Sequence, residues 1–511
     1  MYTFDQNAEL TIPHAPLVGE NSFLSIPADT APLPTFGEIR KKLPVPVWEG
    51  HETYVNAYYK AWEIAFRNLR APAPDTGFVS NFIDAAFNNH IFMWDSCFML
   101  MFGKYADRLF RFQGTLDNFY SHQHKDGFIC RAISEEKGTD RFTRWDPSAT
   151  GPEVMPWCEW EYYLNLGDRE RLAKVFPPLM AYHRWMREHL TWQDGSYFST
   201  GWGCGMDNLP RLRPEYHTAF SHGHMTWVDS CMQEYLSCDV LLQMSQILGR
   251  SEFFDELRQE QELLDRIINT ELWDEETGFY YDRQRDGQRN TVRHVGAFWG
   301  LLAGCAREER AARLISYLEN EQEFKTPTRV PALSRSHEKY SPLGQYWCGG
   351  VWAPTTYMVL KGLDRHGRYA LSHEIGAEYL ASVVDVYRES DTFFENYAPE
   401  PVNGKPAQGN IAGRDFVGWT GLAPISVLFE YVFGIKATAH KAQIEWHVEL
   451  LERHGIEGYP FGKDGTLSLL CEARDSADET PRITLKSNVP VTLTVIWGKG
   501  DGKKTMTLKN E

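Results

Sequence analysis

The chain has 511 residues, of which 42% are hydrophobic and 24% charged, and a formal net charge of −17. These values indicate a globular protein with a large core. The acidic balance argues against nucleic-acid binding, because basic patches supply most of the affinity for phosphate backbones, and weakly against anionic membrane surfaces. No run approaches the roughly 20 apolar residues of a membrane span. We therefore expect neither nucleic acid nor a membrane as a partner.

Residues 1–48 are rich in proline and contain short extended runs such as AELTIP and SFLSIP. The N-terminal MYTFDQNAEL has neither the basic region nor the apolar core of a signal peptide. The nine cysteines are scattered and form no CxxC pair, as is typical of reduced thiols. We therefore expect a cytoplasmic protein, whose oligomeric state the sequence leaves open.

The helical period dominates from residue 49 to residue 435. The predicted helices lie near 51–70, 95–105, 107–122, 153–166, 169–191, 226–248, 252–271, 293–304, 307–319, 352–364, 368–388 and 415–434. They come in sequential pairs, and the segment 273–292 is predicted to be an inserted hairpin.

From residue 436 to residue 511 the pattern changes to the strand period, as in TLSLLCEAR and VTLTVIWGK. This predicts a small β-domain, to which the extended runs of residues 1–48 are candidates to add strands. About twelve paired helices fit either an α-solenoid or an (α/α)6 barrel. Solenoids carry a sequence repeat, and this chain has none. The predicted fold is therefore mainly α, an (α/α)6 barrel followed by the β-domain.

Aromatic residues make up 14% of the chain and include 17 tryptophans, many of them in loop-like segments. Core packing is the usual role of tryptophan. Aromatic rings among polar groups at loops also suit a sugar, whose apolar C–H face stacks on an indole while its hydroxyls need hydrogen bonds. This pattern indicates a carbohydrate substrate.

Five predicted inter-helix loops combine tryptophan, glycine or acidic residues. The first is GWGCGMDNLPR (201–211), where three glycines and Pro210 argue against regular structure around Asp207. The others are NNHIFMWDSCF (88–98), QHKDGFICR (123–131), YWCGGVWAPTTY (346–357) and FFENYAPEPVNG (393–404). Taken singly, each fits an ordinary turn, helix cap or core contact. Together they indicate one shared site.

Two carboxylates on facing loops are the minimum for glycoside hydrolysis, and no metal is needed. A tryptophan wall can keep one of them protonated by desolvation. His222 and His224 form an HxH pair, but no carboxylate stands at a telling spacing for zinc. Neither a GxGxxG, a P-loop nor a GxSxG motif occurs. A nucleophilic role for Cys204 would need a positioned base. We therefore expect no metal and no cofactor.

These segments resemble glycoside hydrolase family 63 and its trehalase relatives, inverting α-glycosidases with (α/α)6 barrels that include the mannosylglycerate hydrolases. The resemblance covers roughly residues 80–430. GMDNLPR is similar to the family's GMDNSPR, WDSCF to its WDS segment, QHKDGFICR to its DG-I loop, YWCGGVWAP to its YWRG-x-VW segment, and FFENYAP to its ENY-P segment. Leu209, Cys204 and Cys348 depart from these patterns. The departure at Cys348 leaves the identity of the substrate open rather than the type of reaction.

The resemblance implies that Asp207 is the general acid and Glu395 the general base. It also implies a substrate pocket with further binding residues. These are Trp94, Asp95, Gln123, Trp202, Gly205, Arg211, Trp347, Trp352 and Trp419. Arg211 would orient a neighbouring carboxylate through its bidentate fork.

The predicted function is exo-acting hydrolysis of an α-linked disaccharide or short oligosaccharide, most readily an α-glucoside or α-mannoside, with inversion. One alternative is a polysaccharide lyase or sugar epimerase on the same barrel, which would depend on a tyrosine or histidine base such as His222, His224 or His294. The other is a non-catalytic carbohydrate-binding protein, whose binding would survive Asp207→Asn without turnover.

Overall fold

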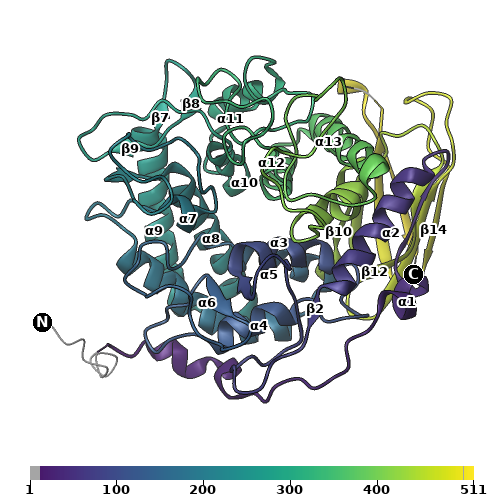
Figure 1. The fold of residues 1–511 in the computed structure, drawn as a ribbon. Helices are drawn as coiled ribbons and strands as arrows, with labels where there is room; N and C mark the ends of the chain where they lie inside the picture. Colours follow the sequence, from purple (N-terminus) through teal and green to yellow (C-terminus); the bar gives the residue numbers. More distant parts are fainter. Residues whose placement is uncertain (1–11, 499, 511) are drawn as a thin grey trace, which may run out of the picture.

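Each of the twelve predicted helical stretches contains a helix in the computed structural model, which describes residues 12–498 and 500–510. The helices stand around a common centre (Figure 1). Their bounds are α2 (Glu52–Arg67), α3 (Met93–Gly103), α4 (Gly114–Ser121), α5 (Met155–Leu166), α6 (Arg169–His189), α8 (Val228–Leu248), α9 (Phe254–Ile267), α10 (Trp299–Ala303), α11 (Glu308–Ser316), α12 (Ala353–Arg365), α13 (Tyr369–Ser390) and the π-helix η10 (Ala423–Val432).

Alternate helices contact one another in a closed series. The contacts run from α3 to α5, α8, α10, α12 and η10, and η10 contacts α3 again. The helices between them in the sequence pack outside this series, as α6 does on α5, α9 on α8 and α13 on α12. The inner helices are largely buried, and every residue of α3 and η10 is buried. This arrangement collects the loops at the helix ends around one centre.

Local sequence sets the ends of these helices. Asp168 caps α6, because its side chain accepts a hydrogen bond from the backbone N–H of Arg171 at 3.0 Å. Gly167 ends α5 in the left-handed region, with φ of 69°. None of the described helices is long and apolar enough to cross a membrane.

The C-terminal region forms two four-stranded sheets. One has the order β1 (Val45–Trp48), β12 (His454–Phe461), β13 (Gly465–Cys471) and β14 (Ile483–Ser487). The other has the order β10 (Ile435–Thr438), β11 (Gln443–His447), β15 (Val491–Trp497) and β16 (Lys504–Asn510). Residues alternate between buried and more exposed along β13 and β15, as strands with one packed face require. The yellow strands stand at one side of the helices in Figure 1.

The N-terminal segment joins the first sheet through β1, which pairs antiparallel with β12 in the register Val45 to Glu457. The prediction that SFLSIP is extended is wrong, because Ser22–Ser25 forms a 3-10 helix. Asn21 caps this helix by accepting a hydrogen bond from the N–H of Phe23 through its side chain. AELTIP lies mostly outside the described residues.

Both turns of the predicted hairpin segment 273–292 form: β7 (Trp273–Asp274) pairs with β8 (Phe279–Tyr280), and Arg283 bridges antiparallel to Arg289 across the second turn. The strand β9 (Arg283–Gln284) pairs in addition with β6 (Met225–Thr226), which lies far away in the sequence. Local turn signals could not indicate this long-range pairing.

Candidate active site

A pocket of about 380 Å³ collects most of the predicted site residues. Eight of the eleven line it: Trp94, Asp95, Trp202, Gly205, Asp207, Trp347, Glu395 and Trp419. The other lining residues are Phe87, Asn88, Phe92, Arg131, Arg141, Phe142, Gly151, Pro152, Tyr346, Ile411, Gly413 and Phe416. Three carboxylates therefore face one small cavity whose walls are largely aromatic.

The loop that carries Asp207 begins with one helical turn, α7 (Gly201–Cys204), where we had expected no regular structure. Thr200 caps this turn by accepting a hydrogen bond from the N–H of Gly203 at 2.9 Å. Gly205 then ends it with φ of 78°, a region that glycine adopts readily. Gly201 allows a close backbone approach, since a Cβ there would lie 2.3 Å from the carbonyl oxygen of Thr218.

The neighbouring Asn208 joins this loop to the segment of Trp347. Its side-chain oxygen accepts from the N–H of Trp347 at 2.8 Å, and its amide donates to the carbonyl of Gln345 at 3.3 Å. These bonds fix Asp207 relative to the aromatic wall, as preorganised chemistry requires.

Burial raises the pKa of Asp207 to about 6, even though the positive charge of Arg131 lowers it, and the nearby Glu395 raises it further. The guanidinium of Arg131 is itself anchored, because its Nε donates to the carbonyl of Ser148 at 2.6 Å. A carboxyl group with this pKa can carry a proton near neutral pH. Burial also holds the pKa of the Cys204 thiol far above its ordinary value, which disfavours that thiol as a nucleophile.

Glu395 has both carboxylate oxygens occupied. Tyr346 donates its hydroxyl to Oε1 at 2.9 Å, and the N–H of Gly413 donates to Oε2 at 2.9 Å. Burial raises the pKa of Glu395, and these two hydrogen bonds lower it, leaving a net upward shift. Tyr346 has φ of 57°, an uncommon backbone conformation for a tyrosine that is often found at functional sites.

Asp95 stands in the first turn of α3 and is 6% exposed. Burial raises its pKa well above the ordinary value, and the charge of Glu395 adds to this rise. Within the part of the chain that the structure describes, its Oδ1 has no hydrogen-bond partner. A buried, unpaired carboxyl oxygen beside a cavity can accept a hydrogen bond from a ligand hydroxyl.

The aromatic wall consists of stacked tryptophans. Trp347 stacks on Trp352 with ring centroids 4.0 Å apart and planes at 3°, and Trp419 packs edge-on against Trp352 at 5.7 Å. The indole Nε1 of Trp419 donates to the carbonyl of Glu395 at 2.7 Å. The ring of Trp94 lies against Gly205, whose added Cβ would stand 3.5 Å from it. The wall therefore also supports both acid-bearing loops.

The structure places three predicted substrate contacts outside the pocket lining. Gln123 is buried, and its amide donates to the carbonyls of Gly127 and Pro178 at 3.0 and 2.8 Å. It therefore links the turn in which it lies to α6. Trp352 lies behind Trp347 and Trp419 as their support.

Arg211, the third, turns away from the pocket and forms a buried clamp. Its guanidinium pairs with Asp229 at 2.8 Å through two nitrogens, with Asp282 at 2.5 Å, and stacks on Trp227 at 4.0 Å. It orients carboxylates as predicted, but Asp207 is not one of those it bonds.

Sequence reasoning missed several residues that line the pocket, of which Asn88, Arg131, Arg141 and Tyr346 carry polar groups. Arg131 and Tyr346 belong to segments that had been singled out, QHKDGFICR and YWCGGVWAPTTY. The segments were therefore informative, but the choice of Gln123 over Arg131 needed the direction of each side chain.

The histidines that the rival interpretations invoke lie outside the pocket lining. His222 and His224 pack around Trp192, and His294 is buried 3.6 Å from Asp282. Among the described residues, the HxH pair belongs to no group of three potential metal ligands.

A family model described as a mannosylglycerate hydrolase MGH1-like glycoside hydrolase domain matches residues 88–420, more than half of the chain. The chain belongs to this family. It is therefore a glycoside hydrolase, and the resemblance inferred from the loop motifs is confirmed. This membership disfavours the lyase, epimerase and non-catalytic interpretations.

Individual relatives are distant. The mannosylglycerate hydrolase of Thermus thermophilus is 25% identical over 387 residues, which cover 62% of this chain and 90% of the relative. A solved structure of a GH63 mannosylglycerate hydrolase from Thermus thermophilus, in complex with Tris and D-glycerate, has a TM-score of 0.59 at 22% identity, covering 72% of this chain and 98% of that one. The solved structure of the neutral trehalase of Saccharomyces cerevisiae has a TM-score of 0.55 at 14% identity, and the match covers 81% of this chain and 93% of the trehalase chain.

Proposed function

We propose that this glycoside hydrolase is an exo-acting, inverting α-glycosidase built on an (α/α)6 barrel. The closed series of contacts from α3 through η10, with partner helices outside it, supports the barrel. The observation that carries the activity is that Asp207 and Glu395 line one small pocket in contrasting environments. A pocket walled by tryptophans suits a single terminal sugar, which supports exo action.

Asp207 serves as the general acid and Glu395 as the general base. Glu395 takes a proton from a water molecule while the oxygen of that water attacks the anomeric carbon. The bond from that carbon to the leaving oxygen breaks, and Asp207 gives its proton to this oxygen. Asp207 suits the acid role because burial keeps it protonated up to about pH 6. Glu395 suits the base role because Tyr346 and Gly413 hold its ionised oxygens.

The substrate is an α-glucoside or α-mannoside of low molecular weight, by analogy with the mannosylglycerate hydrolase and trehalase relatives. The unpaired Oδ1 of Asp95 accepts a hydrogen bond from a hydroxyl group of the terminal sugar. Arg141 lines the pocket, is exposed, and has no ion-pair partner among the described residues. Its free charge makes conjugates with an acidic aglycone, such as glycerate, worth including in any substrate panel.

The test is proton NMR on the protein mixed with α-glucosides, α-mannosides and α-galactosides, with glycerate conjugates included. Spectra are recorded in the first minutes, before mutarotation mixes the anomers. We expect the β-anomer to appear first, since inversion at an α-linked carbon gives the β-product. The α-anomer appearing first would replace inversion by retention. Equal turnover by Asp207→Asn would remove Asp207 from the mechanism.

Replacing Tyr346 by phenylalanine is expected to lower kcat about tenfold and to move the acidic limb of the pH–rate profile upward. The Tyr346 hydroxyl favours the ionised form of Glu395, so its loss raises the pKa of the base, which must be ionised to act. The measurement is kcat/KM against pH for the parent and the variant. An unchanged acidic limb would mean that Glu395 is not the base, or that Tyr346 does not tune it.

A further inference from the structure

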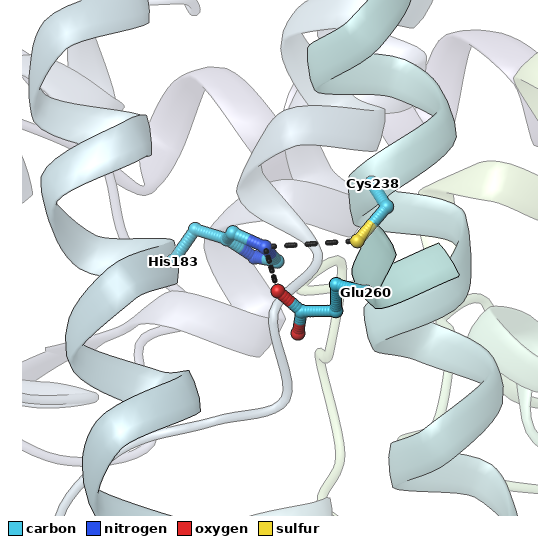
Figure 2. A group of neighbouring side chains, drawn as sticks. All are labelled: His183, Cys238 and Glu260. Atoms are coloured by element: carbon cyan, nitrogen blue, oxygen red, sulfur yellow. Dashed lines mark hydrogen bonds and ion pairs between the residues drawn. The ribbon is translucent and has the colours of Figure 1, made fainter. Parts of the chain in front are cut away.

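Three buried side chains from three different helices meet away from the pocket. His183 lies on α6, Cys238 on α8 and Glu260 on α9, and they point toward one another (Figure 2). Their exposed fractions are 2%, 1% and 3%. One ligand atom of each side chain lies within 4.8 Å of a ligand atom of the other two.

His183 Nε2 lies 3.3 Å from Glu260 Oε2, which is long for a charged N–H to carboxylate hydrogen bond, usually about 2.7–2.9 Å. The same nitrogen lies 3.7 Å from Cys238 Sγ, within hydrogen-bond reach of a sulfur atom. Tetrahedral zinc, with bonds of about 2.0–2.3 Å, holds a nitrogen and an oxygen ligand about 3.3 Å apart and a nitrogen and a sulfur ligand about 3.6 Å apart. The two distances from His183 Nε2 match two edges of such a tetrahedron.

The surrounding groups orient the ligands as the outer shell of a zinc site does. His183 Nδ1 lies 2.8 Å from Glu153 Oε2, which holds a proton on Nδ1 and directs Nε2 toward Cys238 and Glu260. Glu260 keeps its second oxygen, Oε1, bonded to the hydroxyl of Tyr197. Glu153 and Tyr197 therefore hold the His183 ring and the Glu260 carboxylate in place before any ion binds.

The charge balance around the cluster also favours a cation. Glu153, Glu234 and Glu260 are all buried within reach of the His183 ring. Glu153 Oε1 and Glu234 Oε2 are buried and have no hydrogen-bond partner among the described residues. Arg187 contacts Glu260 Oε2 at 3.3 Å, but its side chain is 44% exposed and can turn to solvent. A divalent ion would take over the compensation of these carboxylates that the His183 ring and Arg187 supply without it.

We propose that His183, Cys238 and Glu260 bind a zinc ion, with water as the fourth ligand, and that this ion fastens α6, α8 and α9 together. His, Cys and Glu are ligand types that zinc accepts in one site. The three positions are too far apart in the sequence for ligand spacing to have indicated them, and our sequence analysis expected no metal.

The first experiment measures zinc by mass spectrometry in the full chain, produced in zinc-supplemented medium and purified without chelator. We expect about one zinc per chain in the parent. Cys238→Ala and Cys238→Ser should carry less than about a tenth of that, because the thiolate ligand is gone. Cys471→Ala is the matched control, since it removes another buried free thiol, from β13, and should keep the zinc.

Protein produced with cobalt in place of zinc adds a spectroscopic test. A thiolate-to-cobalt charge-transfer band is expected in the parent and in Cys471→Ala, and its absence in both Cys238 variants. Glu153→Gln should weaken zinc affinity about 10–100-fold, measured by chelator competition, because it removes the negative charge of the carboxylate that accepts from Nδ1. A parent free of zinc after this preparation, or Cys238 variants that keep zinc and the cobalt band, would overturn the proposal. None of these readouts depends on turnover.

Discussion

Replacing Asp207 by asparagine is expected to lower kcat about 10²–10⁴-fold on an α-glycoside with a poor leaving group, while KM changes little. Asparagine keeps the shape of the side chain but cannot donate a proton to the departing oxygen, and a positioned acid contributes a factor of this size. The measurement is steady-state kinetics on the best substrate from the NMR panel.

The pH dependence gives this prediction a second, independent readout. Asp207 must be protonated to act, so activity should fall as pH rises through its pKa of about 6. Glu395 must be ionised, so activity should rise with pH through a pKa above its ordinary value. The expected profile is a bell, and Asp207→Asn should lose its basic limb.

Leaving-group ability separates an acid from a residue that only binds. A dinitrophenyl glycoside needs little protonation, so Asp207→Asn should recover most of its activity on it. Asp95→Asn is the matched control, because it changes another buried acid of the same pocket. Asp95→Asn should lose activity equally on both substrates and should keep the basic limb. If the two variants exchanged these behaviours, Asp95 would be the acid.

Loop composition predicted the pocket better than it predicted individual contacts. Trp94, Asp207 and Glu395 come from three segments that no local signal connects, and the structure brings them together. What they share is a tryptophan, acid or glycine at the end of a helical stretch, and helices packed in a closed series gather such ends around one centre. The composition of the loops was therefore sufficient to indicate the location.

Side-chain direction was the part that the sequence could not supply. Gln123 and Arg131 flank the same turn, yet Gln123 bonds backbone carbonyls and Arg131 faces the pocket. The glycines of 201–205 suggested an irregular loop, but Gly201 and Gly203 lie in a capped helical turn and only Gly205 has a positive φ. Such choices depend on long-range contacts, as between Gly201 and Thr218.

Arg211 shows that a family motif can contain residues that stabilise the fold beside residues that carry the chemistry. Replacing Arg211 by methionine is expected to lower the free energy of unfolding by about 3–5 kcal/mol. Methionine fills much of the same volume but leaves Asp229 and Asp282 buried without their cation. The measurement is urea unfolding followed by tryptophan fluorescence. Arg213→Met is the matched control, since Arg213 is a partly exposed arginine two residues away that pairs with Asp286, and it should barely move the midpoint.

The pH dependence of this loss identifies its electrostatic origin. Burial alone would raise the pKa of Asp282, but Arg211 and His294 outweigh it and hold the pKa well below its ordinary value. A carboxyl group with a lowered pKa stabilises the fold above its ordinary pKa, and this stabilisation is lost as pH falls. The gap between parent and Arg211→Met should therefore be at its full width near pH 7 and narrow as pH falls below about 4, the ordinary pKa of an aspartate, toward pH 2. A gap that stays constant over this range would attribute the loss to packing on Trp227 rather than to charge.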